Sequence, residues 1–368
     1  MEKVVLFHPF VPDSALKKVN DVLGTRWIGQ GPQVELFEKR FKDKFAKESH
    51  CIAVGSGTDS LHLAYICAGI KPGDEVIVPV FTCTATNIPL LYLGAKIIFA
   101  DIDPNTLNIN VDHVKTLISE KTKAIVCVHY GGLPCDLNSL NKLSKQYDIP
   151  LIQDSAHAIG AKYEGQDISN LSDFSCYSFQ AIKTITTGDG GMLTVKNQEL
   201  KEKAKRLRWF GIDREKKSQG IWENDIIEVG YKYQMTDISA AMGLAGLDSF
   251  DEQFFHRRRL FLEYEKKLKN ISGLRFVNSN KKEFLHGLWL ATIIVKNRIG
   301  LEKKLKDQNI ESGQVHYRND RYEIFSEFKK NNLPNMDKLE NDYLVLPMHS
   351  KVNLKDVDRI VNVIKSGW

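Results

Sequence analysis

One lysine stands within an uncharged stretch of the chain, YSFQAIKTITTG, where Ser178 and Lys183 are five positions apart. Lysines avoid such settings unless their stems lie along the surface or their amines react. Partial burial would lower the pKa of this amine and free it as a nucleophile toward an aldehyde. An ordinary surface lysine is the alternative interpretation of the same pattern.

A carboxylate and an imidazole follow the apolar run in LIQDSAHAIGA, as Asp154 and His157. If this run is a strand of a parallel sheet, Asp154 lies at its carboxyl end, where open α/β sheets bind ligands. A helix N-cap for Asp154 and a structural role for His157 remain open.

The segment AVGSGTDSLHLA predicts a strand that turns sharply into a helix at Gly57 and Thr58. Such a turn offers backbone amides and the positive end of a helix dipole to an anion, although it also occurs simply to make the bend. A dinucleotide is the poorer fit, because Ser60 replaces the third glycine of that fingerprint and the next apolar run, EVIVPV, ends without an acidic residue. A single phosphate suits the turn better.

Apolar runs of strand length alternate with helical patterns along the first half of the chain. The expected strands are CIAVGSG, EVIVPV, KIIFAD, KAIVCVH, PLIQDS, DFSCYSF and GGMLTV, and the helices include TDSLHLAYICAGI, TATNIPLLYLGA, LNSLNKLSKQY and a surface helix over residues 197–208. This alternation predicts an α/β fold with a mostly parallel central sheet flanked by helices.

The composition changes near residue 250, where FDEQFFHRRRLFLEYEKKLKNI predicts a long amphipathic helix. We therefore expect a large domain over residues 1–250 and a smaller C-terminal α+β domain over 251–368. The first 30 or so residues are expected to cross between the two, because TRWIGQGP contains loop-forming glycines and a proline.

Bulk properties exclude several classes of protein. The 368 residues carry a net charge of only +5, with Lys and Glu interspersed, so no basic face for nucleic acid is expected. Six cysteines form no CxxC pair and no Cys/His cluster at metal spacing, which predicts reduced thiols and no metal site. The N-terminal segment MEKVVLFHPFVPDS is neither a signal peptide nor a membrane span, and we expect a cytoplasmic protein.

Taken in order, SGTDSL, the strand-end Asp154 with His157, and SFQAIK followed by TTGDGG resemble the DegT/DnrJ/EryC1/StrS sugar aminotransferase family. WIGQGPQVELFEKRF, GYKYQMTDISAAMGLAGL and LVLPMHSKVN extend the resemblance over nearly the whole chain. It implies the aspartate aminotransferase fold, which is fold type I of the enzymes that use pyridoxal 5'-phosphate (PLP).

The resemblance also implies which residues serve the cofactor, in its PLP and pyridoxamine forms. PLP needs a lysine to hold its aldehyde, an acid to keep its ring nitrogen protonated and donors for its phosphate. Lys183 matches the Schiff-base lysine and Asp154 the acid. The remaining cofactor-binding candidates are Gly57, Thr58, Ser178 and His157.

By the same resemblance, an amino group passes from L-glutamate to a nucleotide-linked keto-(6-deoxy)sugar, at C3 or C4. Lys183 would move the proton in both halves of the reaction. The amino sugar would serve surface polysaccharides or glycoconjugates, including lipopolysaccharide O-antigen. The resemblance implies a homodimer with its active site at the subunit interface.

Three features depart from the family's pattern or extend it. Cys83 stands where an aromatic residue commonly stacks on the cofactor ring, and a thiol is too small to stack. Lys232, in GYKYQMTD, is a further cofactor-binding candidate, since the family's residue at or near this position, often asparagine, reaches the cofactor phosphate in the neighbouring subunit. In the predicted small domain, the substrate-binding candidates are His316, Tyr317 and Arg318.

Three alternatives stay open. A subgroup of this fold has histidine at the lysine position and dehydrates the sugar at C3, and Lys183 argues against that subgroup. A non-catalytic regulatory relative could keep the fold without the reaction. A nicotinamide-dependent sugar dehydrogenase would bind a dinucleotide and show no visible chromophore.

Overall fold

The computed structural model describes residues 2–214, 220–221, 225–278 and 283–368. Its largest element is a seven-stranded sheet in which β10 alone runs antiparallel to the other strands. The sheet confirms the predicted fold class, and each of the seven expected runs forms one of its strands. In spatial order these are β1 (His50–Val54), β10 (Gly191–Val195), β9 (Phe174–Ser178), β6 (Leu151–Asp154), β5 (Thr122–Val128), β2 (Glu75–Pro79) and β4 (Lys96–Ala100).

Helices cover both faces of this sheet because alternate strand residues point to opposite sides. In β1, Ile52 and Val54 pack in one buried cluster, while Cys51 and Ala53 pack in another. The first cluster includes α3 (Gly57–Cys67), α4 (Thr84–Tyr92) and α7 (Gln198–Leu207). The opposite face is covered by α2 (Pro32–Phe45) and α9 (Asp237–Asp248) at one end and by α5 (Val111–Leu117) and α6 (Leu137–Tyr147) at the other.

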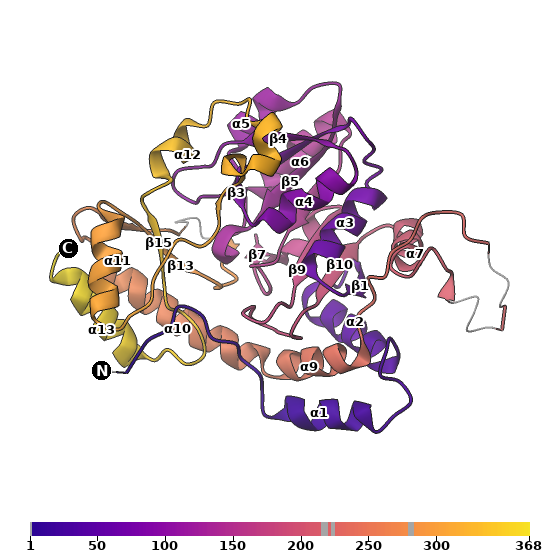
Figure 1. Ribbon diagram of the computed structural model, residues 1–368, viewed down its shortest axis with the longest axis horizontal. Coiled ribbons are helices and arrows are strands. Elements are labelled where there is room, and N and C mark those ends of the chain that lie inside the picture. The colour runs from indigo at the N-terminus through magenta and orange to yellow at the C-terminus, as the bar shows by residue number, and fades with distance from the viewer. Residues whose placement is uncertain (1, 215–219, 222–224, 279–282) are drawn as a thin grey trace.

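The C-terminal part of the chain builds a second, three-stranded antiparallel sheet, on the left in Figure 1. It contains β11 (Leu274–Phe276), β13 (Ala291–Val295) and β15 (Tyr343–Leu346), and it packs with α10 (Phe250–Leu268), α11 (Arg298–Asp307) and α13 (Leu354–Lys365). The boundary predicted near residue 250 falls at the start of α10. Two further elements matter for the site, the short strand pair of β3 (Phe81–Thr82) with β14 (Tyr317–Arg318) and the helix α12 (Pro334–Leu339).

The N-terminal segment contacts both parts of the molecule. The amide of Val4 donates to the carbonyl of Asn309, and Glu311 donates back to the carbonyl of Val4. The following helix, α1 (Ser14–Leu23), packs against α9. Among the helices of the described residues, none combines the length and the hydropathy needed to cross a bilayer.

Candidate active site

A cavity of about 280 Å³ opens at the carboxyl ends of the parallel strands. Strand β6 ends at Asp154 and pairs in parallel with β9, which ends at Ser178, while α3 begins three residues after the end of β1. Three separate stretches of sequence therefore meet at one edge of the sheet, as the strand-end positions predict. Eight of the eleven predicted site residues line this cavity, namely Gly57, Thr58, Cys83, Asp154, His157, Ser178, Lys183 and His316.

Asp154 lies at the floor of the cavity and is 4% exposed. Its Oδ2 atom accepts a hydrogen bond from Thr86 Oγ1 at 2.7 Å, and its Oδ1 atom accepts from the amide of Ala156 at 3.1 Å. Burial raises the pKa of Asp154, against these hydrogen bonds and the charge of Lys183, which lower it. A cationic group bound beside Asp154 would stabilise the charged carboxylate, which burial alone disfavours.

Lys183 follows the strand β9 and points into the same cavity. Burial lowers the pKa of its amine to about 8, and the charges of Asp154 and Cys83 oppose the shift. The Nζ atom lies 3.6 Å from the centroid of the Trp289 ring. An amine with this pKa can both hold and release a proton near neutral pH.

The start of α3 forms a cradle for an anion. Ser56 caps the helix by accepting from the amide of Asp59 at 3.0 Å. Gly57 and Thr58, whose amides lie in the first turn and have no partner within the helix, line the cavity. A Cβ atom on Gly57 would lie only 2.9 Å from Cβ of Ser178, so glycine permits this close approach. Backbone amides, a helix dipole and a hydroxyl group together suit a phosphate monoester.

His157 forms one wall of the cavity and stays neutral, because burial lowers its pKa. Its Nδ1 atom accepts from the amide of Gly131 at 3.3 Å, and its Nε2 atom lies 3.2 Å from Nε2 of His316. His316 adopts a positive φ of 65°, which is uncommon for a residue other than glycine. The hydroxyl group of Tyr343 donates a hydrogen bond to the carbonyl of His316 at 2.6 Å. Such backbone strain is frequent at functional sites.

Trp289 lines the cavity, although the sequence did not indicate it. Its ring stacks on His157 with 3.9 Å between centroids. In the sequence it stands in the apolar run GLWLATIIV, which reads as an ordinary core strand. Only the approach of this segment to the large sheet turns its indole toward Lys183.

Three of the predicted site residues lie outside the cavity lining. Lys232 is exposed, with its Nζ atom 5.3 Å from the Phe210 ring. Tyr317 is 37% exposed and carries Arg321 above its ring at 4.9 Å. The third residue, Arg318, points away from the cavity into a cluster of acidic side chains.

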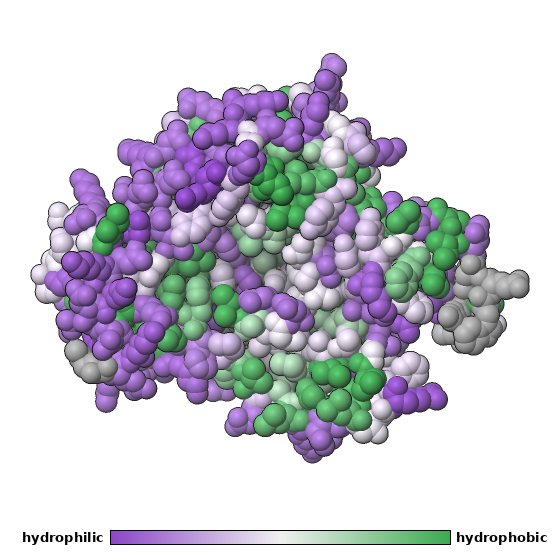
Figure 2. Space-filling model, in the orientation of Figure 1, coloured by the Kyte–Doolittle hydropathy of each residue, from purple (hydrophilic) through white to green (hydrophobic). Residues whose placement is uncertain are grey.

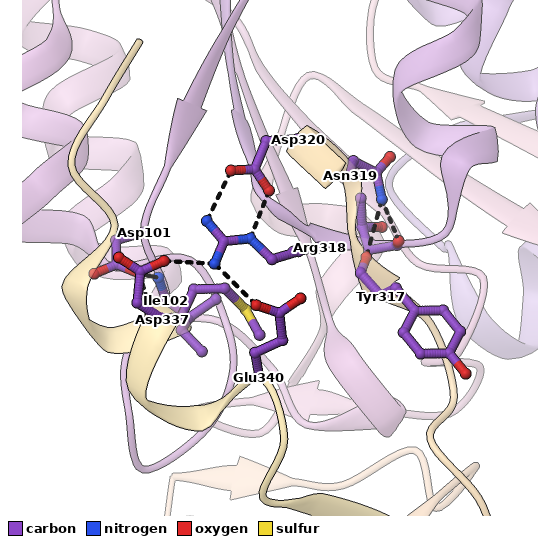
Figure 3. A network of polar contacts seen from close by, with 10 residues as sticks. Asp101, Ile102, Tyr317, Arg318, Asn319, Asp320, Asp337 and Glu340 are labelled. Atoms are coloured by element: carbon purple, nitrogen blue, oxygen red, sulfur yellow. Dashed lines mark hydrogen bonds and ion pairs between the residues drawn. The ribbon is translucent and has the colours of Figure 1, made fainter. Parts of the chain in front are cut away.

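The guanidinium of Arg318 is bound entirely by protein carboxylates, as Figure 3 shows. Its Nε and Nη2 atoms donate to the two carboxylate oxygens of Asp320 at 2.6 and 2.7 Å. Its Nη1 atom lies 2.5 Å from Oδ1 of Asp337 and 3.2 Å from Oε2 of Glu340. The neighbouring Tyr317 points in the opposite direction. Because the planar fork of Arg318 is already committed, we assign it to fixing α12 and β14 and not to binding a ligand carboxylate or phosphate.

Replacing Arg318 with methionine should lower the free energy of unfolding by about 3–5 kcal/mol, because the carboxylate of Asp320, 1% exposed, loses its buried partner. The matched control is Asp337→Asn, since Asp337 is 56% exposed and such pairs contribute about 1 kcal/mol or less. Urea unfolding measures both values. Equal losses in the two variants would contradict the distinction.

Folding also brings together Cys127, His129 and Cys135, whose candidate ligand atoms lie within 4.8 Å of one another. The sequence spacing did not predict this cluster. Both ring nitrogens of His129 are engaged, one by the amide of Cys135 at 3.0 Å and the other by Gln153 Oε1 at 2.5 Å. Burial raises the pKa of Cys135 and lowers that of His129 to about 4. These contacts indicate a hydrogen-bonded core.

Comparison with known proteins assigns the chain to a family. Residues 11–365 match the DegT/DnrJ/EryC1/StrS aminotransferase family. The chain is 34% identical to the UDP-4-amino-4-deoxy-L-arabinose–oxoglutarate aminotransferase of Shewanella sediminis, over 99% of this chain and 97% of that one. It is also 34% identical to the GDP-perosamine synthase of Escherichia coli O157:H7, over 94% and 96%.

A solved structure agrees with this assignment. The sugar aminotransferase CalS13 from Micromonospora echinospora superposes with a TM-score of 0.92 at 30% identity, covering 99% of both chains. The predicted family, fold and cofactor are thereby confirmed. The chain belongs to the DegT/DnrJ/EryC1/StrS aminotransferase family and is an enzyme that works with pyridoxal phosphate.

Proposed function

We propose that this enzyme transfers an amino group from L-glutamate to a keto sugar carried by a nucleotide, at C3 or C4 of a 6-deoxyhexose. The observation that carries the proposal is the meeting of Lys183, Asp154 and the amide cradle of Gly57 in one cavity. The activities for which the two relatives are named support a nucleotide-linked sugar as the amine acceptor. The product would enter surface polysaccharides or glycoconjugates, such as O-antigen.

Each part of the cavity fits one part of the cofactor. Lys183 would hold the aldehyde through Nζ, Asp154 would face the ring nitrogen, and Gly57, Thr58 and Ser178 would hold the phosphate. Bound pyridoxal phosphate supplies a ring that withdraws the electrons released when an amino acid loses its Cα proton. The buried carboxylate of Asp154 favours the protonated ring nitrogen, which strengthens this withdrawal.

Lys183 performs the proton transfers in this proposal. Once its amine is free, Nζ would take the proton from Cα of the amino acid and give it to the C4′ carbon of the cofactor. The lowered pKa of about 8 suits both steps. The walls formed by His157, His316 and Trp289 shield the reacting atoms from water.

The sugar and its nucleotide would enter beside His316 and Tyr317, at the edge of the cavity. Because Arg318 is bound by Asp320, the cation that meets the substrate's carboxylate or phosphates must come from elsewhere. As a separate contact, Lys232 of a second subunit would reach the phosphate of the cofactor. This side chain is exposed and does not line its own subunit's cavity, which fits a contact across an interface.

A homodimer is part of the proposal. Exposed apolar side chains gather over α1 and on the side of α7 in Figure 2. Leu16, Ile227 and Val229 are 78%, 73% and 80% exposed, which is costly for apolar groups unless another surface covers them. The location of the enzyme in the cytoplasm stays a prediction.

The direct test incubates the protein with L-glutamate and a panel of nucleotide-linked 3-keto and 4-keto 6-deoxy sugars. We expect 2-oxoglutarate and an amino sugar in equal amounts, from one or a few of the sugars. A dehydrated sugar without 2-oxoglutarate would favour the dehydratase alternative. Cofactor binding with no turnover would favour the non-catalytic relative. Membership in an aminotransferase family already shows that the nicotinamide alternative is wrong.

A further inference from the structure

Trp289 contacts both Lys183 and the residue that precedes it. Its Nε1–H group donates to the carbonyl of Ile182, the residue before the lysine, at 3.1 Å. The face of its ring lies 3.6 Å from Nζ of Lys183. The indole therefore touches both the backbone that carries the lysine and the amine at its tip.

The indole is held in a single orientation by its other contacts. The backbone amide of Trp289 donates to the carbonyl of Gly131 at 2.9 Å. His157 stacks on the ring at 3.9 Å between centroids and Phe7 at 5.8 Å. Trp289 is 3% exposed. A side chain fixed in this way can hold a partner at a defined place.

The amine of Lys183 needs such a partner whenever it is protonated. In the part of the chain that the structure describes, its Nζ atom makes a cation–π contact and no hydrogen bond to protein. The titratable groups around it are Asp154, Cys83, His157 and His316, and both imidazoles are neutral because burial lowers their pKa. A buried ammonium without hydrogen bonds gains stabilisation from an aromatic face, most of all from indole.

We propose that Trp289 is a positioning residue for Lys183, with its N–H group fixing the backbone at Ile182 and its ring face holding the ammonium that Nζ forms when it carries a proton. The inference rests on the proposed role of Lys183 as the proton-transferring amine. Trp289 itself exchanges no proton. It acts by keeping Nζ near the reacting atoms and by favouring its charged form.

The ring contact predicts a measurable pKa shift in the cofactor-free protein. The pH dependence of acylation of Lys183, followed by peptide mass spectrometry, gives the pKa of its amine. Replacing tryptophan with fluorinated tryptophans keeps the shape of the ring but weakens its attraction for cations. We expect the pKa of Lys183 to fall in step with the number of fluorines, by roughly one unit at most. An unchanged pKa across the series would overturn the ring contact.

Point variants separate the two contacts. Trp289→Phe keeps an aromatic face and loses the N–H group. The pKa of Lys183 should therefore stay close to its value in the parent protein, while turnover slows with little change in KM. Trp289→Leu loses both contacts and should slow turnover further. Equal kcat values for Trp289→Phe and the parent would overturn the backbone contact. The fluorinated proteins remain informative even if a point variant fails to fold.

Failure of the underlying function would look different. Borohydride reduction of the parent protein with pyridoxal phosphate should label Lys183, and labelling elsewhere would refute the proposed role of this lysine. If Lys183 is labelled but its pKa is the same in all the fluorinated proteins, only the role assigned to Trp289 is refuted.

Discussion

The Lys183→Met variant is expected to lose amino transfer by at least about 10²–10⁴-fold, the usual contribution of a positioned acid–base group. It should also lose the visible absorbance of lysine-bound pyridoxal phosphate. Methionine fills a similar volume, so the cavity walls should stay in place. The formation of 2-oxoglutarate and the absorption spectrum measure the two effects.

A matched control is Lys96→Met, since Lys96 is exposed at the start of β4 and lies outside the cavity. It should keep full turnover and the parent's spectrum. A Lys183→Met protein that still transfers amino groups at the parent's rate would end the proposal for this lysine.

The same variant has a second expected effect, on stability. The pKa of Lys183 falls from 10.5 in the unfolded chain to about 8 in the folded protein, so the unfolded chain binds the proton more tightly. Below pH 8, burial of the charged Lys183 amine lowers the free energy of unfolding of the cofactor-free protein by up to about 3 kcal/mol. This destabilisation disappears as the pH rises from about 8 to 10.5. Cofactor-free Lys183→Met should therefore be the more stable protein at pH 7.

Denaturant unfolding of both cofactor-free proteins between pH 7 and 10 checks this expectation. The difference between them should shrink as the pH rises. A difference that is constant over this range would show that the lysine is not desolvated in the folded state.

Asp154→Asn is expected to reduce turnover by roughly 10²-fold or more, as removal of one preorganised electrostatic group does. Asparagine can still accept from Thr86 through its carbonyl oxygen, so the geometry should persist. It carries no charge to favour a protonated ring nitrogen. The kcat for amino transfer and the affinity for pyridoxal phosphate, read from its absorbance, report the effect.

Asp101→Asn is the control for burial of a carboxylate outside the site. Asp101 is 3% exposed and accepts from the amides of Asn335 and Met336 at the start of α12. Its neutralisation should lower stability and leave kcat nearly unchanged. Equal losses of kcat in the two variants would show that Asp154 acts only through the fold.

The sheet and much of the cavity could be predicted from the sequence because each depends on local pattern. Apolar runs of six or seven residues bounded by turns predicted all seven strands. Asp154 and Ser178 are strand-end residues, so the topology alone brings them together. Gly57 could be found because a strand-to-helix turn with a close neighbour requires glycine.

Other features depend on packing between distant segments, which local pattern does not encode. Tyr317 and Arg318 are adjacent in sequence, yet Figure 3 shows them pointing in opposite directions. Whether Arg318 meets a ligand or Asp337 depends on where α12 packs. The part played by Trp289 likewise depends on Gly131, which lies 158 positions away along the chain.

The N-terminal segment has a consequence for biosynthesis. The amide of Leu6 donates to the side chain of Glu311, 305 positions later, and Phe7 lies against Trp289. At translation rates of about 5–20 residues per second, this segment leaves the ribosome at least about 15 s before its partners exist. One wall of the cavity can therefore assemble only when synthesis is nearly finished, and under the proposed function the nascent chain stays inactive until then.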